Sequence, residues 1–187
     1  MAVGTTINDE DKLFYITFTC FDWLPLIERA KAYDLVYKWF LYLQKKGIEV
    51  IGYVVMPNHL HCIINFPSKG FSLNTVIANA KRFLAYEIFK RLSGNGEHEL
   101  LKTLRNSITG SRFLKGQRHT AFRSSFDAKA IRSRRFLIQK MRYMHLNPVR
   151  GNYNLVEDWR DYAHSSAGFY EYGLPGFFRP VHYEDLT

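Results

Sequence analysis

Residues 53–66 constrain the possible fold more than any other stretch of the chain. They form two apolar runs on either side of Pro57-Asn58, a dipeptide that favours a turn. We therefore expect two strands joined as a hairpin. Because side chains alternate along a strand, His59 and His61 share one face of the second strand. Their imidazoles would lie roughly 6.6 Å apart along it, close enough to approach one ion.

The His-x-His pattern alone is weak evidence for a metal site. One core histidine and one exposed histidine, each simply hydrogen-bonded, would give the same pattern. The strand context and the preceding Pro-Asn make the pattern more specific. Two imidazoles would suit zinc, but a metal site needs further ligands.

The order of the expected elements indicates an α+β fold. Residues 13–21 are dense in aromatic and β-branched side chains, which favour a strand. Leu35, Trp39 and Leu43 recur at four-residue spacing, which favours a helix. We expect strands at 13–21, 49–56, 59–66 and 121–127, helices at 27–46, 73–92 and 131–147, and a helical fragment at 99–107.

This order predicts a ferredoxin-like βαββαβ core, in which a mainly antiparallel sheet carries helices on one face. Such a sheet would leave its other face broadly open to a substrate. We interpret residues 1–187 as one domain with a core at about 13–150. A basic excursion would occupy about 94–120, and an irregular, aromatic tail would occupy 151–187.

The charge of the chain indicates a polyanionic partner. The net charge is +9 over 187 residues, which suits nucleic acid or an anionic membrane surface. No apolar run of about 18 residues is present, so we expect no membrane span and no signal peptide. Cys20 and Cys62 lie in apolar runs and are expected to be buried, reduced thiols of a cytosolic protein.

The last expected helix offers further candidates for a site with the histidines. Gln139, Tyr143 and Asn147 are spaced four apart and therefore share one helix face. The amide oxygen of Asn147 would complete a site of two nitrogens and one oxygen with open positions. Such a site suits Mg²⁺ or Mn²⁺ better than closed zinc coordination. In a chain with 12 tyrosines, ordinary packing is the alternative interpretation of Tyr143.

Residues 53–61, followed by 143–151, resemble the REP-associated tyrosine transposases. These are single-tyrosine transposases of the His-hydrophobe-His (HUH) type, and they act on single-stranded DNA. Residues 161–166 also resemble the family, and the match runs in register from about residue 13 to residue 170. Two features depart from the family pattern: the stretch 94–120 is longer and more basic, and Phe122-Arg123 stands where a Trp-Gln pair is usual.

The resemblance implies a role for each matched residue. Tyr143 matches the nucleophile, and His59, His61 and Asn147 match the ligands of a divalent ion, Mg²⁺ or Mn²⁺. The expected activity is that of a DNA strand transferase. Attack by Tyr143 on a phosphodiester would give a 5′-phosphotyrosine and a 3′-hydroxyl, and a second DNA end would reverse the step without ATP.

The expected partner is single-stranded DNA or a DNA hairpin, bound in the bacterial cytoplasm at the nucleoid by a monomer or a homodimer. Two alternatives stay open. One is a metal-dependent phosphodiesterase that uses water, and the other is a non-catalytic nucleic-acid-binding module.

Basic side chains near the expected site are candidates for phosphate contacts. A scattered set of this kind is usually just a solvated face, but here the residues crowd around the expected site. The residues that we predict to bind DNA are Lys81, Arg82, Arg118, Arg123, Arg135, Arg142 and Arg150.

Overall fold

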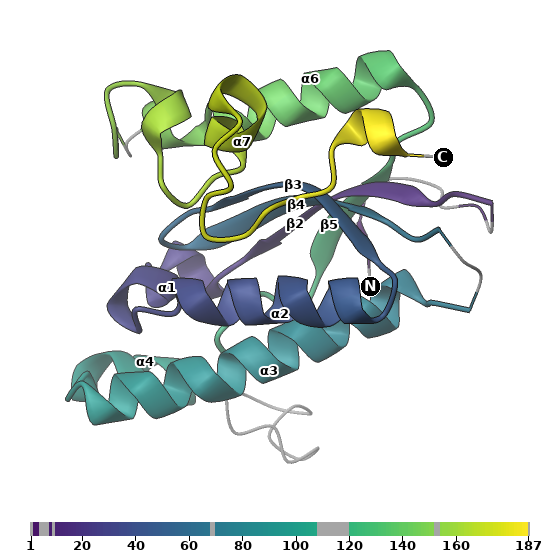
Figure 1. Cartoon of the computed structure of the whole chain (residues 1–187). Coiled ribbons are helices and arrows are strands. Elements are labelled where there is room, and N and C mark those ends of the chain that lie inside the picture. The colour runs from purple at the N-terminus through teal and green to yellow at the C-terminus, as the bar shows by residue number, and fades with distance from the viewer. Residues whose placement is uncertain are drawn as a thin grey trace.

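The computed structural model describes residues 2–3, 8, 10–67, 70–107, 120–151 and 154–186. A twisted sheet lies between two layers of helices (Figure 1). Its described strands run in the order β1-β5-β2-β4-β3. The four longer strands all pair antiparallel, and short β1 pairs parallel with β5. The strands are β1 (Ala2–Val3), β2 (Leu13–Thr19), β3 (Glu49–Val55), β4 (His59–Asn65) and β5 (Phe126–Ala130).

Helices lie on both faces of this sheet (Figure 1). One layer consists of α1 (Leu26–Arg29), α2 (Tyr33–Lys45), α3 (Leu73–Gly94) and α4 (His98–Asn106). On the other face lie α6 (Arg134–His145) and α7 (Ala167–Tyr172). The short 3₁₀ helices are η1 (Phe21–Trp23), η2 (Asn147–Val149), η3 (Trp159–Asp161) and η4 (Tyr183–Asp185).

The predicted α+β, ferredoxin-like fold is confirmed, and the strand pairing matches it. The expectation of a broad open sheet face was wrong. The reason is that α6 and the C-terminal segment bury their own apolar cluster against that face, which includes Ile63, Met141 and Met144.

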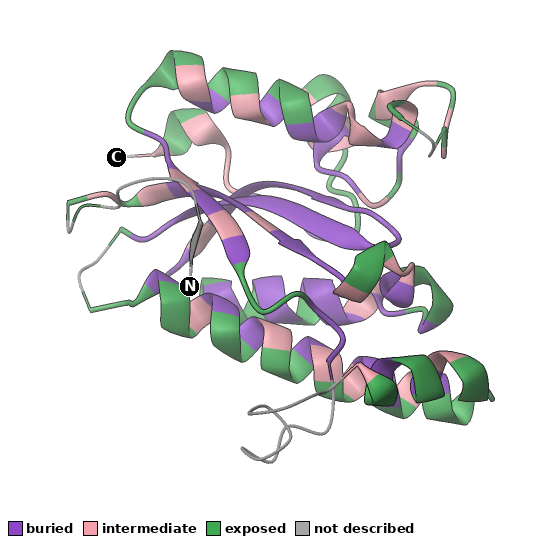
Figure 2. Ribbon diagram, turned by 180° about the vertical axis from the view of Figure 1, so that it is seen from behind, coloured by how far each residue is buried: buried purple, intermediate pink, exposed green. Residues whose placement is uncertain are grey.

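The alternation along β4 is as predicted. Leu60, Cys62 and Ile64 belong to the core beneath α2 and α3, whereas His59 and His61 lie on the α6 side. The whole strand is buried, as Figure 2 shows for the centre of the sheet. Cys20 and Cys62 are both buried free thiols, as expected. In the described residues, no helix is long and apolar enough to cross a membrane.

Two predicted elements have different bounds. The helix expected at 27–46 is broken between α1 and α2, because Lys31 adopts a left-handed conformation with φ of 48°. The strand expected at 121–127 is displaced, since β5 spans Phe126–Ala130. Phe122 makes only an isolated bridge to Cys20.

Helix α6 begins and ends at residues with clear local causes. The Ser133 hydroxyl accepts a hydrogen bond from the Phe136 amide at 3.3 Å and caps the first turn. The helix ends at His145, two residues before Asn147-Pro148, because the residue before proline disfavours the helical conformation. The helix is therefore shorter than the predicted 131–147, and Pro148 accounts for its end.

The C-terminal tail is more ordered than the irregular segment we expected. It contains α7 and also pairs with the outer strand of the sheet. The Val55 amide donates to the His164 carbonyl at 2.8 Å, and the Val181 amide donates to the Val50 carbonyl at 3.0 Å. These bonds cover backbone groups of β3 that an edge strand would otherwise expose. Within the predicted excursion 94–120, α4 is present, and residues 108–119 lie outside the described part.

Candidate active site

His59 and His61 project from β4 toward α6, and both are buried. Their ring centroids are 4.8 Å apart at an interplanar angle of 80°. Burial lowers the pKa of His59 to about 4 and the pKa of His61 well below its ordinary value. Both imidazoles are therefore neutral at pH 7, which is the state in which histidine binds a metal.

The orientation of His59 is set by its neighbour Asn58. Nδ1 of His59 lies 2.7 Å from Oδ1 of Asn58. The other end of that amide is also fixed, because its Nδ2 donates to the Trp23 carbonyl at 2.9 Å. An amide oxygen only accepts, so Nδ1 of His59 must donate and Nε2 is the unprotonated nitrogen. Sequence reasoning treated Asn58 as a turn residue and missed this role.

His61 is held by two hydroxyl groups on the neighbouring strand. Its Nδ1 lies 2.8 Å from the Tyr15 phenol and 2.6 Å from the Thr17 hydroxyl. Both residues come from β2, where Thr17 is the direct partner of His61 in the ladder. Hydroxyls can accept from Nδ1, which would direct the Nε2 lone pair into the site, because a histidine that binds a metal through one nitrogen usually donates a hydrogen bond from the other. Neither residue was among the predicted site residues.

Asn147 lies in η2, immediately after α6, and faces both histidines. Its Nδ2 donates to the Tyr143 carbonyl at 3.0 Å, one turn back. The same side chain hydrogen-bonds with His59 and His61 and raises the pKa of each, opposing the larger effect of burial. Because Nδ2 is engaged with the Tyr143 carbonyl, Oδ1 is the atom of this amide that would face the imidazoles as an acceptor.

The donor set consists of two neutral imidazoles and one amide oxygen. In the described residues, no cluster of three His, Cys, Asp or Glu side chains provides an alternative metal site. The mixed nitrogen and oxygen set fits a divalent ion with open coordination positions better than closed zinc coordination.

Tyr143 on α6 lies beside this donor set. Its ring centroid is 5.9 Å from that of His61 and 6.3 Å from that of Tyr15. The side chain is 46% exposed, so a substrate can reach its hydroxyl. The Lys140 ammonium lies 5.4 Å from the Tyr143 ring centroid and 5.1 Å from that of Tyr15. The structure therefore brings together all four residues of the predicted catalytic and metal sites, with a cation next to the tyrosine. Gln139, which continues the same row, is exposed.

A tryptophan that sequence reasoning assigned only to a turn stands at the edge of the site. Trp23 is 49% exposed, and its ring centroid is 5.6 Å from that of His59. The Arg123 guanidinium lies over this indole, with its Cζ 5.1 Å from the ring centroid. Both Asp22 and Trp23 have positive φ, a backbone conformation that is unfavourable for a bulky residue such as Trp23. The sequence feature that could have identified Trp23 as a site residue is a large aromatic side chain in a polar turn.

The predicted DNA-binding residues separate into two groups. Arg135, Arg142 and Arg150 are exposed on or just after α6, and no carboxylate pairs with them within the described ranges. Two other arginines nearby are already neutralised, since Arg132, just before this helix, pairs with Asp11, and Arg134, its first residue, pairs with Glu184. The first group thus leaves available positive charge on and just after the helix that carries Tyr143, and Arg123 adds positive charge beside Trp23.

Of the second group, Lys81 and Arg82 do not project into this site. The Lys81 ammonium donates to the backbone carbonyls of Arg123, Ser124 and Ser125. All three of its donors are therefore used within the fold, which corrects the predicted role in DNA binding. Arg82 lies in the α2–α3 layer, across the sheet from the histidines. Arg118 falls outside the described residues.

Comparison with known proteins supports the fold. No protein-family model matches the chain, and no curated protein matches it in sequence. A solved structure of a REP-associated tyrosine transposase bound to a REP hairpin is similar, with a TM-score of 0.59 and 15% identity over 89% of this chain and 82% of that chain. A candidate transposase from Deinococcus radiodurans R1 aligns with a TM-score of 0.45 and 14% identity over 76% of this chain and 95% of that chain.

The fold and site define an α+β protein in which a His-x-His strand faces a helix that carries a tyrosine. More particularly, the chain has the fold seen in the REP-associated tyrosine transposase, which confirms the fold that the sequence resemblance implied.

Proposed function

We propose that this protein is a transposase-like DNA strand transferase that cleaves and rejoins single-stranded DNA through Tyr143. One observation carries the proposal. A half-exposed tyrosine lies 5.9 Å, ring to ring, from one of two paired neutral histidines, and an amide oxygen faces the same pair. A water-based hydrolase would not require a tyrosine at this position.

His59, His61 and Asn147 would hold a divalent ion, Mg²⁺ or Mn²⁺. When bound, such an ion neutralises the charge of a phosphodiester and makes its phosphorus open to attack. The protein's contribution is to present the three donors together. Asn58, Tyr15 and Thr17 hydrogen-bond the imidazoles, and such contacts would orient them for metal binding.

Tyr143 would then attack the phosphorus through its phenolic oxygen. A bond forms between that oxygen and phosphorus, and the bond from phosphorus to the 3′-oxygen breaks. The phenol loses its proton, and the departing 3′-oxygen gains one. Lys140, beside the ring, favours the negative charge that develops on the phenol. Attack by a second 3′-hydroxyl reverses the step and joins a new DNA end.

The DNA would lie across α6 and the edge of the sheet. Arg135, Arg142 and Arg150 would contact phosphates, and Arg123 would add a further contact next to His59. The Trp23 ring would offer a stacking surface for an unpaired base. The similar transposase is bound to a REP hairpin, and we propose hairpin-containing DNA as the partner here too. Such a substrate places the protein in the cytoplasm.

The deciding experiment uses full-length protein, Mn²⁺ and labelled single-stranded oligonucleotides that contain a hairpin. We expect a protein–DNA adduct that survives denaturation and is lost in Tyr143→Phe. Tyr172→Phe is a matched control, because Tyr172 is also about half exposed but lies on α7. Cleavage that persists in Tyr143→Phe would instead establish a hydrolase that uses water. Salt-sensitive binding without cleavage, with either Mg²⁺ or Mn²⁺ present, would establish a non-catalytic binding module.

A further inference from the structure

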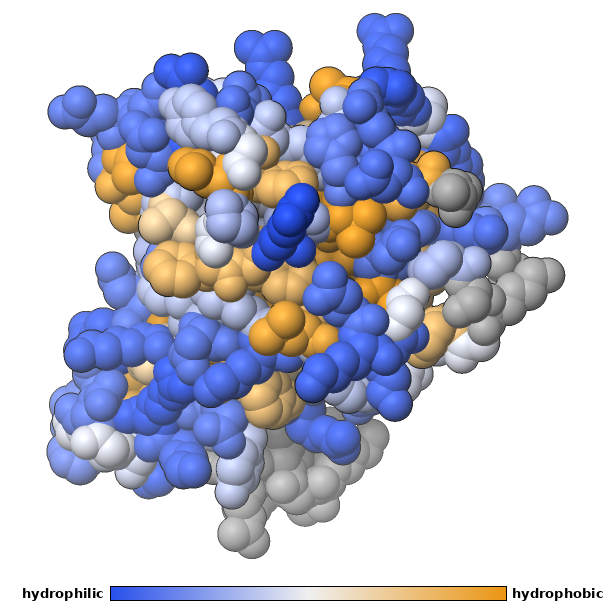
Figure 3. All heavy atoms as spheres, in the orientation of Figure 1, coloured by the Kyte–Doolittle hydropathy of each residue, from blue (hydrophilic) through white to orange (hydrophobic). Residues whose placement is uncertain are grey.

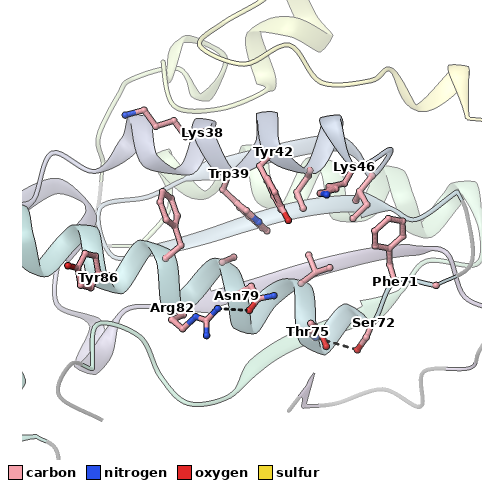
Figure 4. A pocket seen from close by; sticks show the side chains of 16 residues that line it. Lys38, Trp39, Tyr42, Lys46, Phe71, Ser72, Thr75, Asn79, Arg82 and Tyr86 are labelled. Atoms are coloured by element: carbon pink, nitrogen blue, oxygen red, sulfur yellow. Dashed lines mark hydrogen bonds between the residues drawn. The ribbon is translucent and has the colours of Figure 1, made fainter. Parts of the chain in front are cut away.

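A large groove lies between α2 and α3, on the side of the sheet away from the histidines. Its volume is about 1010 Å³. Figure 4 shows side chains of both helices directed into it, and Figure 3 shows hydrophobic surface among hydrophilic surface over this layer. The proposed function leaves this groove without a role. The lining residues that the argument uses are Tyr42 and Lys46 of α2, Arg82, Phe83 and Tyr86 of α3, and Phe71 of the preceding loop.

Aromatic rings at the groove are exposed to an unusual degree. Tyr42 is 56% exposed and Tyr86 is 64% exposed, although each has a large apolar ring. Phe71 and Phe83 are also exposed at the same groove. A gathering of exposed rings in a concave surface marks a binding site more often than a solvated face. Because these rings project from two facing helices, a flat ligand could stack on them.

The charged side chains that line the groove are all cationic. They are Lys38, Lys46 and Arg82, and no described carboxylate lines the groove with them. Asp34 neutralises Lys38 from outside the lining, at 3.0 Å. Lys46 instead lies 5.8 Å from the ring centroid of Tyr42, and Arg82 contacts only the neutral amide of Asn79 among the bonds seen here. Two cations next to exposed rings favour an anionic ligand that carries aromatic groups.

Unpaired nucleotides combine these two properties, since each has a stacking face and a charged phosphate. A second copy of this chain is a poorer occupant, because every copy carries a net charge of +9 and would bring further positive charge to a cationic surface. The groove runs along α3 from Thr75 to Tyr86, roughly 16 Å at 1.5 Å per residue. That length accommodates a short run of nucleotides.

We propose that the α2–α3 groove is a second binding site for single-stranded DNA, separate from the site at Tyr143. Bases would stack on Tyr42 and Tyr86, and phosphates would contact Lys46 and Arg82. This inference goes beyond the proposed function, because binding in the groove requires neither the metal ion nor cleavage. In the context of strand transfer, the site would hold a stretch of strand on the opposite side of the sheet.

The test measures binding of a fluorescein-labelled oligothymidylate to the full-length protein by anisotropy, in EDTA so that no cleavage occurs. Oligothymidylate forms no hairpin, so the measurement reports unpaired nucleotides only. We expect the double variant Tyr42→Ala/Tyr86→Ala to weaken binding roughly 5- to 100-fold. The variant Tyr42→Phe/Tyr86→Phe keeps the rings and should retain the affinity. Leu41→Ala, also exposed on α2 but outside the groove lining, is the matched control.

Charge is tested in the same assay. Lys46→Gln and Arg82→Gln should each reduce the slope of log affinity against log salt by about one. Unchanged affinity in the double alanine variant, once circular dichroism shows that it is folded, would overturn the proposal. A fall in the oligomer mass of the double alanine variant, with its DNA affinity unchanged, would also overturn the proposal, because the groove would then be an interface between copies of the chain.

The adduct assay separates this proposal from the proposed function. If the protein forms no adduct at Tyr143 but the groove variant loses oligothymidylate binding, the strand-transferase proposal is wrong. The second site is then still supported. If an adduct forms at Tyr143 but the groove variant binds oligothymidylate normally, the strand-transferase proposal is supported and the second site is excluded.

Discussion

The Tyr15 phenol lies 2.8 Å from Nδ1 of His61, and this contact joins two strands of the sheet at the centre of the candidate site. The Thr17 hydroxyl reaches the same nitrogen at 2.6 Å. Since these hydroxyls fix the imidazole, Tyr15→Phe combined with Thr17→Val should weaken Mn²⁺ binding about 10- to 100-fold. Isothermal titration calorimetry measures this directly. Binding equal to that of the wild type would show that His61 is not oriented by β2.

Asn147 is expected to act through its oxygen. Asn147→Leu removes the donor at similar size and should weaken Mn²⁺ binding at least tenfold, whereas Asn147→Asp adds a negative charge and should preserve or strengthen it. The Asn147→Asp variant also loses the amide donor to the Tyr143 carbonyl, so comparison of the two variants separates ion binding from helix capping. Equal affinity in Asn147→Leu would remove Asn147 from the donor set.

Lys81 is expected to stabilise the fold and not to bind DNA. Lys81→Met leaves the carbonyls of Arg123, Ser124 and Ser125 without their donor, and we expect the free energy of unfolding to fall by about 1–3 kcal/mol. Urea denaturation measures the change. Lys90→Met, at an exposed position of the same helix, should be nearly neutral, and a similar loss in both variants would contradict the assignment.

Gly52 allows α6 to lie close to β3. A Cβ at this position would lie 2.5 Å from Cε of Met144 and 2.6 Å from Sδ of Met141. Both are ends of flexible side chains, so Gly52→Ala should be tolerated, whereas the larger Gly52→Val should cost about 1–3 kcal/mol. Because Tyr143 is carried by α6, adduct formation should fall as well. Gly94→Ala, which meets no atom within 4 Å, serves as the control in both assays.

The buried histidine at the end of α6 makes stability depend on pH. Burial lowers the pKa of His145 to about 4, below its ordinary value near 6.5. The unfolded chain therefore binds the proton first, and stability that is present above pH 6.5 is lost as the pH falls toward 4. We expect this residue alone to reduce the free energy of unfolding by about 2 kcal/mol between pH 7 and pH 5.

Urea titrations of metal-free protein at these two pH values measure the difference. His145→Gln cannot titrate and should show a smaller difference than the wild type. His98→Gln, at an exposed position, controls for the loss of a histidine as such. An undiminished difference in His145→Gln would place the acid sensitivity elsewhere.

Local pattern was sufficient to predict the hairpin and the face that its histidines occupy. The alternation in residues 59–66 and the turn at Pro57-Asn58 correctly placed His59 and His61 on one face, and the intervening Leu60, Cys62 and Ile64 lie in the main core on the other. Helix α3 and the end of α6 were also predictable, because apolar spacing and proline act within a few residues. The break at Lys31 was not predictable, because it depends on a left-handed backbone at a residue that usually avoids it.

The sequence by itself determined the element order, the antiparallel core and the residue types of the candidate site, including Tyr143 and Asn147. Tertiary structure decided which groups act on them. Strand pairing brought Tyr15 and Thr17 to His61, and a strained turn brought Trp23 to His59. It also directed Lys81 into the fold and placed Arg82 across the sheet. These outcomes depend on contacts between residues far apart in the chain, which propensity and periodicity, acting over short windows, do not encode.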